Sequence, residues 1–169
     1  CNKAIKHARE LIANDFNCNP KDIYFTSCGS ESNNWALKGY AIANRNKGNH
    51  IIVSAIEHDS ILESAKFLES IGFNISYVNA KKDGHINISD IEKLITNQTI
   101  LISVMAVNNE TGCIQPIIEI SKLAKKYNIA YHVDFVQALS QFKPDIKKIK
   151  PDLLTISAHK IHGPKGIGL

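Results

Sequence analysis

The sequence has few of the residues that build disulfide frameworks, metal centres or membrane spans. Its 169 residues include four cysteines, one methionine and one tryptophan. Cys1, Cys18, Cys28 and Cys113 form no CxxC pair and follow no regular spacing, which favours reduced thiols over disulfides or a metal site. The longest uncharged apolar runs, 51–56 and 99–107, are too short to cross a bilayer, and no secretory signal opens the chain. We therefore expect a cytoplasmic protein that contacts no membrane and binds no metal.

The overall composition is that of a globular domain, with 44% hydrophobic and 21% charged residues, and it excludes a disordered chain. The net charge of +4 is unevenly distributed: residues 121–169 carry nine Lys and three Asp, whereas residues 1–120 carry 11 basic and 13 acidic side chains. The lysines between positions 143 and 150 lie around prolines without interleaved aromatic residues. This pattern favours a solvated surface over a nucleic-acid site.

Blocks rich in Val and Ile alternate with helical patterns, as expected for a parallel sheet covered by helices. The predicted strands are 22–26, 50–54, 74–78, 99–105, 130–133 and 152–156. The predicted helices are the segment with an apolar stripe from Ile5 to Phe16, then 30–44, 59–70, 89–95 and 116–127. No repeat or linker divides the chain, so residues 1–169 form one domain. Because the chain opens at Cys1 without a Met and stops within the apolar segment 167–169, we expect both ends to be incomplete.

Polar clusters follow most of the predicted strands. They are the segments 27–30, 57–58, 108–110, 134 and 157–160. In sheets of this kind, ligands gather at the carboxyl ends of the strands. We therefore expect these clusters to meet at one edge of the sheet and form a binding site.

Taken singly, each residue has a structural alternative. Gly29 and Ser30 open a helix whose free N–H groups would hold a phosphate, but Ser30 could also be an ordinary N-cap, with Glu31 near the positive end of the helix dipole. Lys160 could be a nucleophilic amine, activated by nearby positive charge from His159 and Lys165, or a solvated loop lysine.

The remaining candidates are equally open when considered alone. Asp134 follows a buried strand and needs a partner, either a protonated pyridine nitrogen or the next helix. His58 could be a general acid or base, could lie on a flat cofactor, or could be structural. Asn109 and Gln137 could bind a phenolic oxygen or hold a loop. Only the combination of these residues indicates a function.

Together these residues resemble the pyridoxal-phosphate-dependent cysteine desulfurases of the NifS/IscS type, within the class V aminotransferase family. The matching strings are FTS at 25–27 with ESNN at 31–34, EH at 57–58, VNNETG at 107–112, HVD at 132–134 with Gln137, and SAHKIHGPKG at 157–166. The resemblance extends over essentially the whole chain. It implies the large domain of a fold-type I enzyme, a three-layer α/β/α arrangement whose mostly parallel sheet has mainly seven strands in the family.

The same resemblance implies a role for each matching residue towards pyridoxal 5'-phosphate. Lys160 would bind the cofactor's aldehyde covalently, and Asp134 would pair with the ring nitrogen and keep it protonated, so that the ring acts as an electron sink. His58 would stack on the ring and transfer protons. Gln137 would bond the ring oxygen, and Asn109 would help to place ring and substrate.

The resemblance also implies that Gly29, Ser30, Ser157 and His159 hold the cofactor's phosphate. The implied reaction converts L-cysteine to L-alanine and leaves the sulfur as a persulfide on the enzyme, for an iron-sulfur scaffold or another acceptor protein. The implied assembly is a homodimer. In the family, the persulfide-forming cysteine, the arginine that binds the substrate carboxylate and the small C-terminal domain lie beyond residue 169, so this stretch alone is expected to bind cofactor without completing the reaction.

Two departures from the family pattern accompany the resemblance. The sequence has Cys28, Gly29 and Ser30 where the family more often has Gly-Ala-Thr, and a thiol at position 28, near a helix N-terminus, is expected to have a lowered pKa. Phe135 stands where a small residue is usual, and we expect it to crowd the site.

Two rival functions stay open. The first is another class V enzyme, a selenocysteine lyase or an aminotransferase, against which the NNETG string at 108–112 argues. The second is a non-catalytic module for dimerisation or docking. Intact Lys160, Asp134 and His58 argue against it, because a scaffold does not need these three groups.

Overall fold

A parallel five-stranded sheet forms the middle layer of the computed structural model, which describes residues 2–142 and 145–169. The strands are β1 (His50–Ser54), β2 (Asn74–Val78), β3 (Thr99–Ser103), β4 (Ala130–Asp134) and β5 (Leu153–Thr155), in the order β2-β1-β3-β4-β5. Every neighbouring pair is parallel, which confirms the predicted fold class. Cys1, Lys143 and Pro144, which enter the predictions above, lie outside the described residues.

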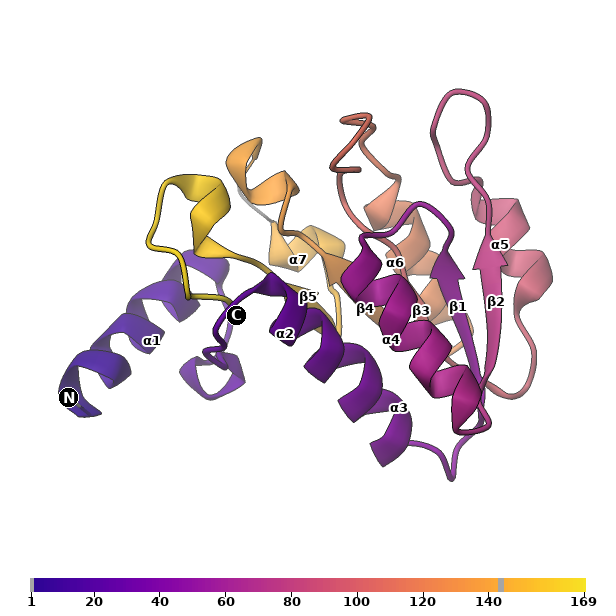
Figure 1. Ribbon diagram of the computed structural model, residues 1–169, viewed down its shortest axis with the longest axis horizontal. Helices are drawn as coiled ribbons and strands as arrows, with labels where there is room; N and C mark the ends of the chain where they lie inside the picture. Colours follow the sequence, from indigo (N-terminus) through magenta and orange to yellow (C-terminus); the bar gives the residue numbers. More distant parts are fainter. Residues whose placement is uncertain (1, 143–144) are drawn as a thin grey trace.

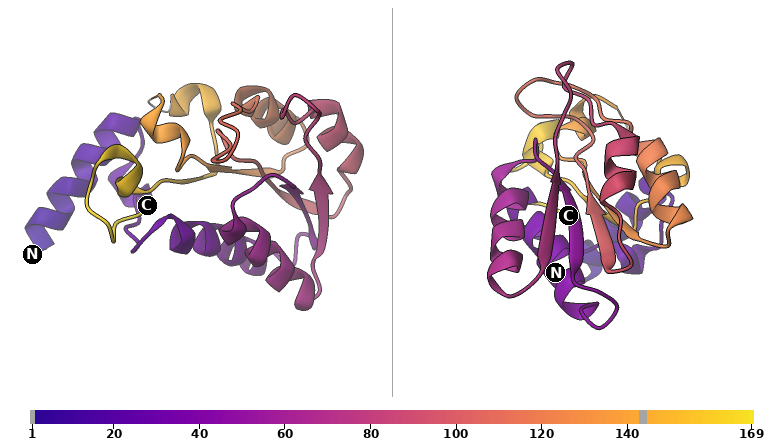
Figure 2. Two further views of the ribbon diagram at one scale, coloured as in Figure 1. Left: turned by 45° about the horizontal axis from the view of Figure 1, so that its top comes forward. Right: turned by 90° about the vertical axis from the view of Figure 1, so that its right-hand side faces the viewer.

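Helices cover both faces of the sheet (Figures 1 and 2). One face carries α2 (Gly29–Asn34), a π-helical turn (Trp35–Gly39), α3 (Tyr40–Ala43) and α4 (Asp59–Ser70), and the other carries α5 (Ile88–Leu94), α6 (Ile117–Lys126) and α7 (Ile146–Ile149). Short 3-10 turns occupy Pro20–Asp22, Ala138–Ser140 and Ala158–Ile161. Each predicted helix is therefore present, with ends shifted by one to three residues at most. Among the described residues, none of the helices has the length and apolarity needed to cross a membrane.

Two apolar cores lie on either side of the sheet because successive strand residues point to opposite faces. On β1, Ile51 and Val53 pack with α3 and α4 in one core, whereas Ile52 packs with α5 and α6 in the other. Because both faces are covered, β1, β3 and β4 are buried along their whole length, with apolar residues at their centres.

Helix α1 (Asn2–Phe16) projects from one end of the molecule, with the N-terminus at its far tip (Figure 2). The predicted apolar stripe does form a helix, but Ala13 is the residue it buries, and Ile5 and Leu11 are 47% and 54% exposed. The periodicity thus identified the helix correctly, while the described part of the chain covers its apolar face only in part.

The predicted strand at 22–26 is the one element that the structure contradicts. Its first residue belongs to a 3-10 turn, and of the rest only Thr26 forms a β-bridge, an antiparallel one with Gly168. Residues 167–169 also pair with 156–158, so they lie between Thr26 and the continuation of β5. The segment 22–26 makes a β-type pairing at Thr26 alone, and β propensity does not make a strand without a neighbouring strand.

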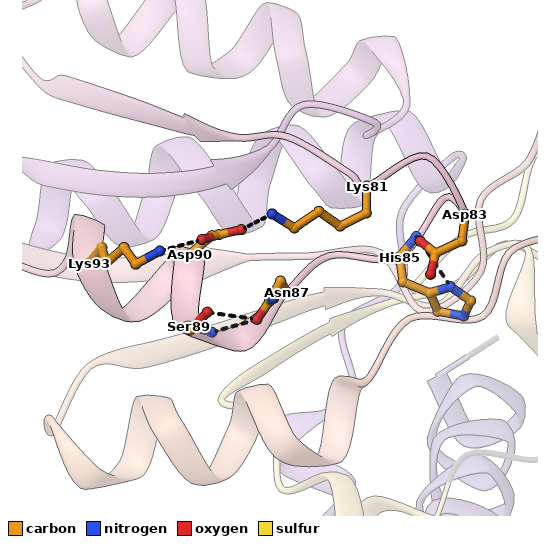
Figure 3. Close-up of polar contacts among 7 residues, drawn as sticks. All are labelled: Lys81, Asp83, His85, Asn87, Ser89, Asp90 and Lys93. Carbon is orange, nitrogen blue, oxygen red and sulfur yellow. Dashed lines mark hydrogen bonds and ion pairs between the residues drawn. The ribbon is translucent and has the colours of Figure 1, made fainter.

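The connection from β2 to α5 is tied down by local polar contacts (Figure 3). Asp90 pairs with Lys81 at 2.6 Å and with Lys93 at 2.8 Å, and these hydrogen bonds lower the pKa of Asp90 to about 2. The Asn87 side chain accepts the N–H of Ser89 and caps α5. Because these pairs are exposed, each contributes little free energy, and together they fix the start of a short helix.

Candidate active site

The predicted polar residues meet in one cavity of about 210 Å³. Eight of the nine predicted site residues line it: Gly29, Ser30, His58, Asn109, Asp134, Gln137, His159 and Lys160. Ser157, the ninth, is buried beside the cavity, and its Oγ lies 2.7 Å from Nδ1 of His159. The cavity lies where β1, β4 and β5 end and where α2 and α4 begin, the position expected for ligands in a parallel α/β sheet.

Two larger hollows, of about 880 and 650 Å³, lie elsewhere. The first surrounds the amino ends of β3 and β4, and the second runs along β5 beside Trp35 and Leu169. None of the nine predicted site residues lines either of them. The smaller cavity is therefore the candidate site, because the chemistry rather than the volume distinguishes it.

The start of α2 forms one wall of the cavity. Cys28 is the N-cap and the helix begins at Gly29, so the alternative interpretation of Ser30 as the N-cap is wrong. A Cβ at Gly29 would stand 2.9 Å from Cγ2 of Val136 and 3.3 Å from Cβ of Ser157, so only glycine lets this backbone approach so closely. The backbone N–H of Glu31 and the Ser27 hydroxyl lower the pKa of the Cys28 thiol, as predicted for a cysteine at a helix N-terminus.

Asp134, the last residue of β4, is a buried carboxylate at the floor of the cavity. Its Oδ1 accepts the N–H of Val136 at 2.9 Å, and its Oδ2 accepts Nδ2–H of Asn33 at 2.7 Å. The pKa of Asp134 is raised overall, because the effect of burial exceeds the lowering by these two hydrogen bonds and by the nearby His58. The carboxylate bonds the N–H of Val136, which precedes the 3-10 turn Ala138–Ser140, so it does not cap the next helix as the structural alternative proposed. It faces a cavity that a cationic partner could enter.

His58 and Lys160 reach the cavity from two different connections. His58 is the N-cap of α4, and its Nδ1 accepts the N–H of Ser60 at 3.1 Å, so the structural interpretation of this histidine also holds. Lys160 lies in the 3-10 turn Ala158–Ile161 that follows β5, beside His159. The turn ends at His162, whose φ of 59° is in the left-handed region. From this turn Lys160 lines the cavity.

Asn109 and Gln137 lie on the two remaining loops around the cavity. Asn108 anchors the first loop, because its Oδ1 accepts the N–H groups of Glu110 and Thr111 while its Nδ2 donates to the carbonyl of Ile56. Asn109 is thereby left exposed at the rim. On the second loop, Oε1 of Gln137 is buried without a hydrogen-bond partner in the described part of the chain.

Phe135 does not crowd the site, contrary to the prediction. Its side chain is fully buried in the core beneath the sheet, where its ring meets Phe142 edge-to-face with centroids 5.3 Å apart. The next residue, Val136, lines the cavity instead. The alternation of side chains at the end of β4 turns Asp134 to the cavity and Phe135 to the opposite side.

Four residues that line the cavity were not predicted from the sequence as site residues, namely Asn33, Ser60, Met105 and Val136. Asn33 stands in the ESNN string, and Ser60 lies two residues after His58, the spacing of an N-cap contact. No three His, Cys, Asp or Glu side chains of residues 2–142 and 145–169 come together as a metal site would require.

The cavity has the features needed to hold pyridoxal phosphate. The buried Asp134 carboxylate suits a protonated ring nitrogen, and Gln137 lines the cavity with an amide whose N–H groups could donate to the ring's oxygen. The close approach at Gly29 leaves a cradle of backbone and hydroxyl groups near Ser157, and Lys160 supplies the amine. Lys160, Asp134 and Gln137 would thus hold the aldehyde, the ring nitrogen and the ring oxygen.

Glu57 is a second buried carboxyl beside the site. Its Oε1 accepts the N–H of Met105 at 2.6 Å, while its Oε2, Ser54 Oγ and Tyr131 OH are buried without partners among the described residues. Burial and the neighbouring Asp134 raise the pKa of Glu57 to about 8. We therefore expect Glu57 to be protonated at neutral pH, and its contact with Met105 ties that backbone to the loop that carries His58.

We expect Glu57→Gln to remove a pH dependence of stability. A carboxyl with a raised folded-state pKa contributes stability that is present below its unfolded pKa and is lost as pH rises through about 8. The variant keeps an acceptor for the Met105 N–H, so its free energy of unfolding relative to the native chain should grow by roughly 2–4 kcal/mol between pH 5 and pH 9.

Urea unfolding at both pH values measures this difference. Glu119→Gln makes the same chemical change at an exposed position of α6 and is the control. An equal difference between Glu57→Gln and the native chain at pH 5 and pH 9 would show that Glu57 is already ionised in the folded protein.

Comparisons with known proteins agree with this geometry. The chain is 50% identical over 166 residues to "Cysteine desulfurase IscS" of Clostridium botulinum (strain Kyoto / Type A2), a match that covers 98% of this chain and 42% of the relative. It is similar to a solved structure titled "SspA in complex with cysteine", with a TM-score of 0.93, 42% identity and coverage of 98% and 48% of the two chains. A solved "NIFS-LIKE PROTEIN" matches with a TM-score of 0.95, 40% identity and coverage of 99% and 46%.

The chain thus spans about two fifths of the length of the curated relative it matches, and slightly less than half of the solved chains. The family described as "Aminotransferase class-V" matches residues 1–169. With the parallel sheet, the lysine after β5 and the carboxylate at the end of β4 in place, this match shows that the chain belongs to the class V aminotransferase family, whose cofactor is pyridoxal phosphate.

Proposed function

We propose that this chain is the cofactor-binding part of a cysteine desulfurase that uses pyridoxal phosphate. One observation carries the proposal: Lys160, Asp134 and His58, from three separate connections of the sheet, line the same small cavity. The N-cap contact between His58 and Ser60 does not account for this convergence, because a histidine can cap a helix anywhere on the surface. The similarity to proteins named cysteine desulfurase supports the choice of reaction within the family.

In the proposed site, Lys160 would hold the cofactor by its aldehyde, and its amine would be free when substrate is bound. Asp134 keeps the ring nitrogen protonated, and Gln137 and Asn109 bond the ring's oxygen side and the substrate. When bound, the cofactor withdraws electrons from the substrate's α-carbon. His58, stacked on the ring, and the freed amine of Lys160 are the groups that take and return the α-proton.

Ser30, Ser157 and His159 supply the proposed phosphate contacts, together with the backbone N–H of Gly29. Two features support this assignment: the helix dipole of the segment 29–43 favours an anion at its start, and Ser157 Oγ and His159 Nδ1 lie 2.7 Å apart beside that start. These residues would anchor the cofactor independently of its bond to Lys160.

The proposed reaction breaks the Cβ–S bond of L-cysteine and transfers that sulfur atom to a protein thiol. The thiol RSH becomes the persulfide RSSH and cysteine becomes alanine, so no external oxidant or reductant is needed. The family resemblance places the receiving thiol outside these 169 residues. We further propose a homodimer that passes sulfur to an iron-sulfur scaffold or another acceptor protein in the cytoplasm, a reducing compartment in which thiols such as Cys18, Cys28 and Cys113 stay free.

The test is made on the intact product of the native gene, incubated with pyridoxal phosphate, L-cysteine and a thiol reductant. We expect alanine and sulfide in equal amounts, measured by amino-acid analysis and sulfide trapping. Turnover of L-selenocysteine but not L-cysteine would identify a selenocysteine lyase, and transfer of the amino group to a 2-oxo acid would identify an aminotransferase. A folded protein that binds cofactor without either product would be a docking module, and the proposed activity would then be wrong.

A further inference from the structure

A single buried amide connects two of the proposed site residues. Asn33 of α2 is 2% exposed and lies between the start of α4 and the ends of β4 and β5. Its Nδ2 donates to Oδ2 of Asp134 at 2.7 Å and to Oγ of Ser60 at 2.9 Å. Its Oδ1 accepts the hydroxyl of Thr155. The amide thus uses both of its N–H groups and its oxygen, each on a different element.

These contacts fix which way the amide faces. The Thr155 hydroxyl donates to Oδ1, and a reversed amide would place Oδ1 against the Asp134 carboxylate, where two acceptors repel. Behind Thr155, His132 is fully buried, its pKa is lowered to about 3 by desolvation, and its Nε2 lies 3.4 Å from the Thr155 hydroxyl. A neutral His132 whose Nδ1 accepts from Ser103 Oγ at 2.9 Å donates from Nε2.

The orientation of the amide then reinforces the proton position on His58 that the backbone of Ser60 already favours. Because Ser60 Oγ accepts from Asn33, its own hydrogen is free to point to Nδ1 of His58, 2.9 Å away. The backbone N–H of Ser60 also points to this nitrogen, at 3.1 Å. Nδ1 therefore receives two donors and carries no proton, so the proton of neutral His58 is on Nε2.

We propose that Asn33 is a positioning residue that holds Asp134 as a hydrogen-bond acceptor and, through Ser60, holds His58 with its proton on Nε2. The parts of this inference that concern cofactor binding rest on the proposed function. The proton arrangement itself is a property of the chain without cofactor. Asn33 thus couples the group that would face the ring nitrogen to the group that would move the α-proton.

A purely structural role for Asn33, fastening α2 to the sheet, makes a different prediction. It would lower the melting temperature without changing the ionisation of either partner. The charged or titratable groups that act on Asp134 are Glu57, from the connection between β1 and α4, and His58, at the start of α4. The pKa of Asp134 and the tautomer of His58 therefore separate positioning from packing, and both can be measured without an activity assay.

The experiment compares the native protein with Asn33→Ala, Ser60→Ala and the control Asn34→Ala by carbon-13 and nitrogen-15 NMR, without cofactor. Asn34 bonds only Ser30 and Lys38 of its own helical segment among the contacts that its side chain makes in the described structure. We expect Asn33→Ala to raise the pKa of Asp134 by about one unit and to mix the two His58 tautomers. Ser60→Ala should affect the tautomer alone, and Asn34→Ala neither.

A cofactor titration followed by visible absorbance completes the test, with about tenfold weaker binding expected for Asn33→Ala. Should that variant fail to fold, Thr155→Val removes the donor to Oδ1 at nearly constant shape, and the same two NMR shifts are expected at smaller size. Native values for Asp134 and His58 in a folded Asn33→Ala or Thr155→Val variant would overturn the inference. If the variants show the expected NMR changes but the native protein binds no cofactor, the proposed function is wrong. The positioning role of Asn33 would then still hold.

Discussion

Lys160→Ala is expected to abolish covalent attachment of pyridoxal phosphate and to lower cysteine turnover by on the order of 10²–10⁴-fold. Lys160 supplies the only amine among the described residues that line the cavity. Without it, the aldehyde has no internal partner and the α-proton loses one of its two proposed carriers. The other residues that line the cavity are unchanged in this variant, so the cofactor should still bind through its phosphate and ring.

Borohydride reduction followed by peptide mapping measures this effect directly. In the native protein, reduction should fix the cofactor on the peptide that contains Lys160, and the visible band should disappear in the variant. Lys165→Ala is the matched control, because Lys165 lies in the same connection but is exposed and does not line the cavity. Label on Lys165, or an unchanged band in Lys160→Ala, would contradict the proposed role.

Much of the fold was predictable because its signals are local. The alternation of apolar strands with helical stripes identified β1 to β5 and α1 to α6, and the ends differ by a few residues at caps such as Cys28. The segment 22–26 has a strand-like composition, yet it pairs only at Thr26, because pairing depends on what lies beside it in space. Phe135 was misplaced for a related reason, since its direction follows from the pleat of β4 rather than from its neighbours in sequence.

The candidate site was predictable as a set of residues but not as a network. Order and spacing singled out Lys160, Asp134 and His58, and the topology brings them to one cavity. The contacts of Asn33 with Asp134 and Thr155 span more than 100 residues each, so no local pattern reveals them. The raised pKa of Glu57 was hidden as well, because it arises from burial between two loops.

Asp134→Asn is expected to lower cysteine turnover by on the order of 10²–10³-fold, because a neutral amide cannot keep the ring nitrogen protonated in a buried site. Oδ2 of Asp134 accepts from Nδ2 of Asn33, so an amide that turns its own N–H towards Asn33 sets two donors against each other. The variant should therefore also lose about 1–2 kcal/mol of stability. Turnover of L-cysteine and urea unfolding measure the two losses separately.

The double variant Asn33→Asp with Asp134→Asn separates the two losses further. It restores a donor and an acceptor to the contact with the residues exchanged, so stability should return towards that of the native protein. The negative charge, however, then lies on α2 instead of at the end of β4, one side chain further from the cavity floor, and turnover should stay low. Recovery of turnover together with stability would show that Asp134 acts by packing alone. Turnover of Asp134→Asn within threefold of the native rate would show that the carboxylate has no part in the chemistry.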